Sequence, residues 1–180
     1  MKSIITEKTS IRLQVKKMKA NISTHDKAKY SLSVLNKLEQ DIDFAKSEYV
    51  IAYWSMKDEL FTHDFIEKWY SKKKIYLPVV IGEILEFRLF EGRSKMKKEK
   101  SFGIYEPIGE ILNDWSIIDY AIIPGVAFDK NNNRLGRGKG FYDKILNGIN
   151  AVKVGVCFEF QVMDKIPIES TDIPMDRVYY

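Results

Sequence analysis

The chain has little cysteine, little histidine and no long apolar segment. Its single cysteine, Cys157, lies in the apolar run VKVGVCF, so we expect a buried reduced thiol and neither a disulfide nor a cysteine metal cluster. His25 and His63 each stand beside an aspartate at an expected helix start, and neither has a second metal ligand nearby in the sequence. We therefore assign no chemistry to either histidine.

The sequence contains no run of eighteen apolar residues and no signal-peptide pattern at its start, which predicts a cytoplasmic protein with no membrane partner. The 29 basic and 25 acidic residues give a net charge of +4, an excess that suits polyanionic small molecules better than nucleic acid. The 180 residues show no repeat or linker, so we expect one domain over 1–180. We also expect a monomer, although the sequence alone does not fix the oligomeric state.

Helical patterns alternate with apolar strands along the chain. The spacing of apolar residues and caps predicts helices over 7–20, 23–38, 64–70 and 141–149, with Ser23 and Thr62 as cap residues. Strands are expected over 48–54, 74–80, 84–90, 119–125 and 151–158. The near-continuous apolar strands at 119–125 and 151–158 are typical of a mainly parallel sheet that helices cover, so the fold class is α/β.

A loop rich in glycine and basic residues precedes the last expected helix. Gly136, Gly138 and Gly140 alternate with Arg137 and Lys139. Glycines let backbone N–H groups approach an anion, and the cations and the helix dipole favour its charge, so the loop predicts a phosphate site. RLGRGKG lacks the Walker spacing, which argues against a P-loop NTPase. A flexible basic turn is the simpler interpretation.

Asp143 follows the last glycine by three residues, in the first turn of the expected helix. It has two interpretations at this point. It could stabilise the helix start through the dipole, or it could bind a magnesium ion that also contacts phosphate.

The segments PGVAFD (124–129) and RLGRGKGFYD (134–143) resemble the signature of the 5-formyltetrahydrofolate cyclo-ligases, also called methenyltetrahydrofolate synthetases. Weaker matches follow in the right order over nearly the whole chain, at Lys8 and Arg12, WSMKDE (54–59), FGIYEP (102–107), and Asp172 with Asp176. The resemblance implies a Rossmann-like, three-layer α/β/α domain with a mainly parallel central sheet. Ligands in such open sheets generally bind in loops at strand ends.

The resemblance also implies an activity. The enzyme would convert 5-formyltetrahydrofolate to 5,10-methenyltetrahydrofolate with ATP as co-substrate and Mg²⁺ as cofactor, releasing ADP and phosphate. The formyl oxygen would be phosphorylated first, and N10 would then close the ring. The alternatives are a non-catalytic folate- or nucleotide-binding protein, an RNA-binding protein, and a sugar-phosphate or coenzyme A enzyme on a similar scaffold.

The residues that match the family's pattern carry its implied roles. Catalysis is assigned to Arg137 and Lys139. ATP binding is assigned to Lys8, Arg12, Arg134, Leu135, Gly136, Arg137, Gly138, Lys139, Gly140, Phe141 and Tyr142. Folate binding is assigned to Arg12, Trp54, Glu59, Arg137, Gly138, Lys139, Gly140 and Phe141. Magnesium is assigned to Asp143 and Asp172, with Asp176 as a less favoured substitute for Asp172.

Several of these residues have ordinary structural interpretations. Lys8 and Arg12 could be solvated charges on one helix face, Glu59 could start a helix, and Trp54 could be a core aromatic. The chain has GFYD where the family usually has GYYD, so Phe141 lacks a hydroxyl there. Asn132 stands where the family often has glycine, and asparagine tolerates the left-handed backbone that a turn can need.

Overall fold

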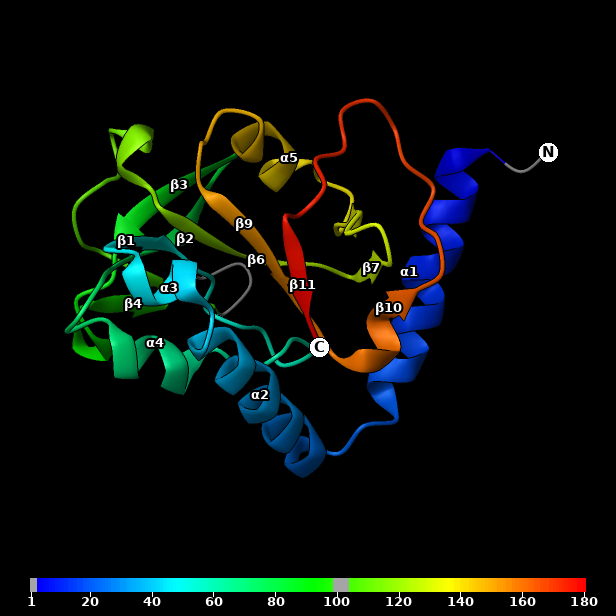
Figure 1. Ribbon diagram of the computed structural model, residues 1–180, viewed down its shortest axis with the longest axis horizontal. Helices are drawn as coiled ribbons and strands as arrows, with labels where there is room; N and C mark the ends of the chain where they lie inside the picture. The colour runs from blue at the N-terminus through cyan, green and yellow to red at the C-terminus, as the bar shows by residue number, and fades with distance from the viewer. Residues whose placement is uncertain (1–2, 99–103) are drawn as a thin grey trace.

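The structure is a computed structural model that describes residues 3–98 and 104–180, and a six-stranded sheet forms its centre (Figure 1). The strand order is β11-β9-β6-β1-β2-β3. The bounds are Tyr49–Ile51 (β1), Lys74–Ile81 (β2), Ile84–Leu89 (β3), Tyr120–Pro124 (β6), Val152–Val156 (β9) and Arg177–Tyr179 (β11). Only β3 runs antiparallel to its neighbour, so the predicted α/β class with a mainly parallel sheet is confirmed.

Helices and loops cover both faces of this sheet. Helices α2 (Thr24–Glu39), α3 (Ile42–Lys46) and α4 (His63–Trp69) pack on one face, and α5 (Phe141–Leu146) packs on the other. Successive strand residues point to opposite faces of the sheet. In β6, Ile122 therefore joins the core under α2, α3 and α4, and Ile123 joins the core under α5. Every residue of β6 from Tyr120 to Ile123 is therefore buried.

A small three-stranded sheet supports the N-terminal helix. Its order is β10-β7-β8, and its bounds are Ala127–Asp129 (β7), Arg134–Leu135 (β8) and Val162–Met163 (β10). Helix α1 (Ile4–Ala20) packs on it through Val15, which shares a buried cluster with Ala127, Leu135 and Ile166. In Figure 1, α1 lies beside β7 and β10, away from the main sheet. The sequence did not predict this sheet, because strands of two or three residues show no clear alternation.

The remaining elements are short. A two-stranded sheet pairs β4 (Met96–Lys98) with β5 (Tyr105–Pro107), and 3-10 turns occupy Arg93–Lys95 (η1), Trp115–Ile117 (η2) and Glu159–Gln161 (η3). Phe102 and Gly103 of the FGIYEP segment, and the last two residues of the basic run 93–100, lie outside the described residues.

The helix boundaries test the predicted caps. Ser23 caps α2 as expected, since its Oγ accepts from the backbone N–H of Asp26 at 3.0 Å. Thr62 stands at the N-cap position of α4, but its hydroxyl donates to the Tyr53 carbonyl at 2.5 Å, so the predicted side-chain cap was wrong. Helix α5 ends at Leu146, three residues before the predicted end, in a turn at Gly148. Asn132 has a φ of 62°, which confirms the left-handed backbone.

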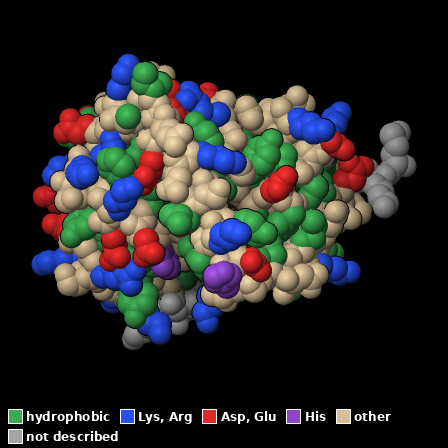
Figure 2. All heavy atoms as spheres, turned by 60° about the horizontal axis from the view of Figure 1, so that its bottom comes forward, with side chains coloured by type: hydrophobic (Ala, Val, Ile, Leu, Met, Phe, Trp, Pro, Cys, Tyr) green, Lys and Arg blue, Asp and Glu red, His purple; other side chains and the backbone are tan. Residues whose placement is uncertain are grey.

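Charged side chains of both signs are interspersed over the face seen in Figure 2, with apolar side chains between them. Among the described residues, no helix is both long and apolar enough to cross a bilayer. Cys157 is 1% exposed, and its burial raises the pKa of the thiol to about 12, as expected for an unreactive core cysteine.

Candidate active site

Four residues on one face of α1, here called the α1 stripe, anchor the helix and contact the segments that form the site. Lys8, Arg12, Val15 and Lys19 follow the spacing of four, three and four residues that places side chains on one helix face. Val15 fixes this face on the small sheet, and the three cations each contact a different segment of the chain. The helix thus connects segments that lie far apart in sequence.

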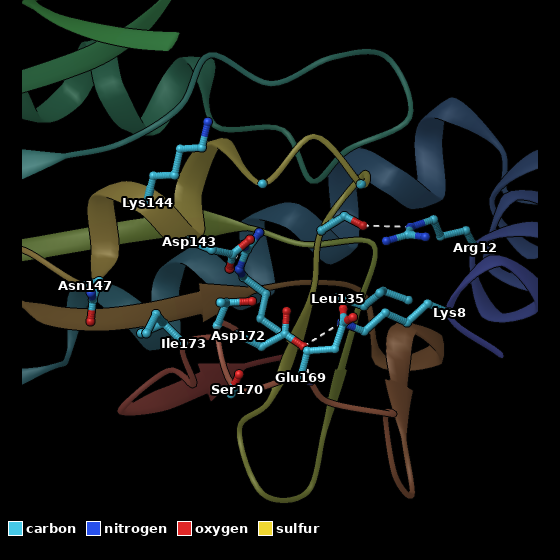
Figure 3. Close-up of a pocket in the computed structure, with 15 residues that line it drawn as sticks. Lys8, Arg12, Leu135, Asp143, Lys144, Asn147, Glu169, Ser170, Asp172 and Ile173 are labelled. Carbon is cyan, nitrogen blue, oxygen red and sulfur yellow. Dashed lines mark hydrogen bonds and ion pairs between the residues drawn. The ribbon is translucent and has the colours of Figure 1, made fainter. Parts of the chain in front are cut away.

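A cavity of about 540 Å³ opens between α1, the glycine loop, α5 and the segment that precedes β11 (Figure 3). It brings together nine of the residues predicted for ATP or metal binding, which are Lys8, Arg12, Arg134, Leu135, Gly136, Gly138, Gly140, Asp143 and Asp172. Its other lining residues are Lys144, Asn147, Glu169, Ser170, Thr171 and Ile173.

Lys8 ties α1 to the C-terminal side of the cavity. Its Nζ lies 2.7 Å from Glu169 Oε2 and 2.5 Å from Asp172 Oδ2 (Figure 3). The backbone N–H of Glu169 donates to the same Asp172 oxygen at 2.8 Å. Burial acts to lower the pKa of Lys8, but the two carboxylates outweigh it and the pKa rises, so the ammonium stays charged. Because Lys8 is only 7% exposed, the interpretation as a solvated surface charge was wrong.

Arg134 lies beneath the glycine loop and is 6% exposed. Its Nη2 contacts Asp143 Oδ1 at 2.6 Å, and its Nη1 donates to the Pro124 carbonyl at 3.2 Å. Its buried Nε has no hydrogen-bond partner within the described ranges. A Cβ on Gly136 would lie 3.0 Å from Nη1, so glycine lets the loop run directly over the guanidinium.

Arg12 holds the same loop from the α1 side. Its Nε donates to the Gly136 carbonyl at 2.9 Å, and its guanidinium carbon would lie 3.5 Å from a Cβ on Gly138. Gly138 has a φ of 99° and Gly140 a φ of 66°, so both positions need the left-handed backbone that glycine tolerates. The loop therefore lies between two guanidinium groups, an environment that favours a bound anion.

The two predicted metal carboxylates line the cavity from two different elements. Asp143 comes from the first turn of α5, and Asp172 from the segment before β11. Asp176 does not line the cavity. Its Oδ2 instead accepts from the backbone N–H of Lys153, in β9, at 2.6 Å. No group of three or more His, Cys, Asp or Glu that could hold a metal is present among residues 3–98 and 104–180. Two carboxylates still suit Mg²⁺ when phosphate oxygens and water complete its six ligands.

Arg137 points to a second group of charges outside this cavity. Its Nη2 contacts Asp58 Oδ1 at 2.9 Å, Asp58 Oδ2 at 3.1 Å and Glu59 Oε1 at 2.9 Å. Lys19 Nζ lies 3.3 Å from Asp58 Oδ2. Burial acts to raise the pKa of Asp58, but Lys19 and Arg137 outweigh it and the pKa lies below its usual value. Burial lowers the pKa of Lys19.

The other predicted site residues lie around these two groups. Trp54 stacks on His63 with ring centroids 4.0 Å apart, and the Arg93 guanidinium lies 5.5 Å from the Trp54 ring. Lys139 Nζ lies 5.5 Å from the Phe141 ring. Tyr142 packs against the core beneath α5, and the guanidinium carbon of Arg134 lies 5.6 Å from its ring.

Sequence reasoning missed Lys19, Asp58 and Glu169. Asp58 adjoins the predicted Glu59, and Lys19 continues the helical spacing from Lys8 and Arg12 through Val15, so both had a detectable signal. Glu169 lies three residues before Asp172 in a polar loop with no periodicity, which gave no comparable signal.

Comparisons of the sequence and of the structure with known proteins all point to one family. The sequence model of the 5-formyltetrahydrofolate cyclo-ligase family matches residues 4–180. The cyclo-ligase of Haemophilus influenzae is 29% identical, with 94% of this chain and 95% of that protein covered. The cyclo-ligase of Escherichia coli K12 is 35% identical, with 72% and 75% covered. The structure of Aquifex aeolicus 5,10-methenyltetrahydrofolate synthetase superposes with a TM-score of 0.85 at 32% identity, covering 96% of this chain and 88% of that one.

The match over nearly the full chain, and the fold shared with the Aquifex aeolicus enzyme, agree with the resemblance found in the glycine loop. The chain belongs to the 5-formyltetrahydrofolate cyclo-ligase family.

Proposed function

We propose that this protein converts 5-formyltetrahydrofolate to 5,10-methenyltetrahydrofolate, using ATP and Mg²⁺ and releasing ADP and phosphate. Family membership supports the folate reaction and implies ATP as co-substrate. The observation that carries the rest is the glycine loop, which lies between Arg12 and Arg134 at the edge of a 540 Å³ cavity.

The loop and its neighbours suit the phosphates of ATP. Lys8, Arg12 and Arg134 supply positive charge to the lining of the cavity, and Gly136, Gly138 and Gly140 leave the backbone of the loop accessible. Asp143 and Asp172 would hold Mg²⁺ together with phosphate oxygens, and the ion would neutralise phosphate charge. In the free protein each carboxylate is paired with a cation of the same cavity, so nucleotide binding would exchange these ion pairs.

The reaction needs a better leaving group on the formyl carbon. The formyl oxygen attacks the γ-phosphorus, so that an O–P bond forms and the bond to ADP breaks. N10 then attacks the resulting iminium carbon, the C–O bond to phosphate breaks, and N10 loses its proton. Positioning and charge neutralisation are the protein's main contributions to such a phosphoryl transfer. We assign them to Arg134, Arg137 and Lys139.

The folate would lie on the Glu59 side of the loop. Glu59 is held by the Met56 backbone N–H at 2.9 Å and by Arg137, so its carboxylate has a fixed position from which to accept from the pterin N–H groups. Phe141 and Trp54 would supply apolar surface. Direct transfer requires the formyl oxygen and the γ-phosphorus to meet beside the glycine loop, which borders the cavity and contacts Glu59 through Arg137.

An absorbance assay for 5,10-methenyltetrahydrofolate tests this proposal. The expected result is product from 5-formyltetrahydrofolate only when ATP and Mg²⁺ are both present, with one ADP released for each product. Product without ATP, or ATP hydrolysis without product from a folded protein, would contradict it.

A further inference from the structure

Lys19 is a buried cation to which the proposed chemistry gives no part. It is 6% exposed, and in the described part of the chain its ammonium has one hydrogen-bond partner, Asp58 Oδ2, at 3.3 Å. A buried ammonium is costly unless a nearby carboxylate compensates it. Lys19, the last residue of the α1 stripe, is therefore paired with Asp58 and compensates the charge of that carboxylate.

Asp58 in turn holds Arg137. All three hydrogen bonds that Arg137 makes with described residues use one nitrogen, Nη2, and end on Asp58 and Glu59. Its Nη1 and Nε have no partner there, and its side chain is 49% exposed. A guanidinium carries five N–H donors in a planar fork, so an anchor at one nitrogen leaves the remaining donors available to a ligand.

The four side chains also balance in charge. Asp58 and Glu59 contribute two negative charges, and Arg137 and Lys19 contribute two positive ones. Without Lys19 the group would be net negative beside the anionic phosphate and folate. The two acids would also compete for Arg137 alone, so its donors would be drawn away from the substrate.

We propose that Lys19 is a positioning residue, which acts through Asp58 to hold Arg137 with its free donors facing the folate and the transferred phosphoryl group. This inference rests on the proposed function, in which Arg137 contacts those groups. Lys19 itself contacts neither substrate.

The test compares Lys19→Met with Lys17→Met, which removes the same charge from an exposed position on the same helix. With Lys19→Met we expect the KM for the folate to rise about tenfold and kcat to fall, because Arg137 is no longer held beside the folate and the transferred phosphoryl group. The KM for ATP should change less than twofold, because Lys8, Arg12 and Arg134 still line the cavity proposed for its phosphates. Lys17→Met should match the wild type, and Lys19→Arg should restore most of the loss. A folate KM equal to that of Lys17→Met, or a parallel rise in both KM values, would overturn the proposal.

A double-mutant cycle with Asp58→Asn gives a second readout, which measures whether the effect of Lys19 passes through Asp58. If Lys19 acts through Asp58, the double variant should lose no more than Asp58→Asn alone. Additive losses would overturn the proposal. Absence of product from the wild type would instead refute the proposed function, and this inference with it.

Discussion

At the scale of single residues, the site depends on charges that are paired inside the protein. Arg134 and Asp143 form such a pair at 2.6 Å, and Arg134 is almost fully buried. Removing one partner leaves the other charge uncompensated, which is costly in a buried site. The same carboxylate is proposed to hold magnesium, so its stability and catalytic roles can be separated by a metal titration.

Asp143→Asn should raise the Mg²⁺ concentration needed for half-maximal activity by about tenfold or more, because a neutral amide is a weaker ligand for a hard cation. Asp164→Asn is the matched control, since Asp164 is an exposed aspartate paired with Lys130 on the surface. The measurement is activity against Mg²⁺ concentration at saturating ATP. An unchanged magnesium dependence in folded Asp143→Asn would remove this residue from the metal site.

Asp41, which does not line the cavity, is expected to make a pH-dependent contribution to stability. Burial acts to raise its pKa, but hydrogen bonds from Tyr120, Asp43 and Tyr179 and the Arg177 guanidinium outweigh it, so the pKa lies below its ordinary value of 3.8. A depressed carboxyl pKa stabilises the folded state above the unfolded pKa, and this stabilisation is lost as the pH falls through the folded value.

Asp41→Asn should therefore cost about 2–4 kcal/mol of the free energy of unfolding at pH 7, because it removes the charged partner of a buried network. Urea unfolding at pH 7, 5 and 3 should show the gap between wild type and variant narrowing below about pH 4. If the difference in free energy of unfolding between wild type and variant stays constant down to about pH 3, the charge of Asp41 does not cause it.

At the scale of elements, two glycines let the small sheet pack closely against the main sheet. Phe128 of β7 is fully buried against Gly125 and against Gly155 of β9, and a Cβ on Gly155 would overlap its ring. The two glycines thus let the small sheet approach the main sheet, which carries β8 and the glycine loop into place.

Gly155→Ala should lower the free energy of unfolding by about 1–3 kcal/mol, the usual cost of overpacking a core. Gly148→Ala should have little effect, because the nearest atom to its Cβ would be the Ile145 carbonyl oxygen at 3.7 Å. Urea midpoints for both variants provide the measurement. Equal midpoints would show that Phe128 moves aside without cost.

Helix α1 contributes Lys8 to the cavity proposed for ATP. Lys8→Met should raise the KM for ATP about tenfold without changing the KM for the folate, because it removes a charge from the cavity on the nucleotide side only. Lys16→Met, an exposed lysine on the same helix, serves as the control. If the KM for the folate rises as well, Lys8 contributes to the folate side or to the fold as a whole.

At the scale of the whole molecule, local patterns in the sequence predicted more than long-range ones. The apolar runs at 119–125 and 151–158 predicted the central strands, and the glycine spacing at 136–140 predicted the loop of the site, because each pattern is complete within a few residues. The contacts of Lys19 and Arg137 with Asp58 span 39 and 79 residues. No single segment of the sequence contains that information, so only the fold reveals it.

The fate of the formyl oxygen tests the central claim, that ATP activates the folate by phosphorylating that oxygen. The substrate would be 5-formyltetrahydrofolate labelled with ¹⁸O in the formyl group, and the released phosphate would be examined by mass spectrometry after a single turnover. The account predicts one ¹⁸O atom in the phosphate for each methenyl product. Unlabelled phosphate, with the label released as water, would contradict it.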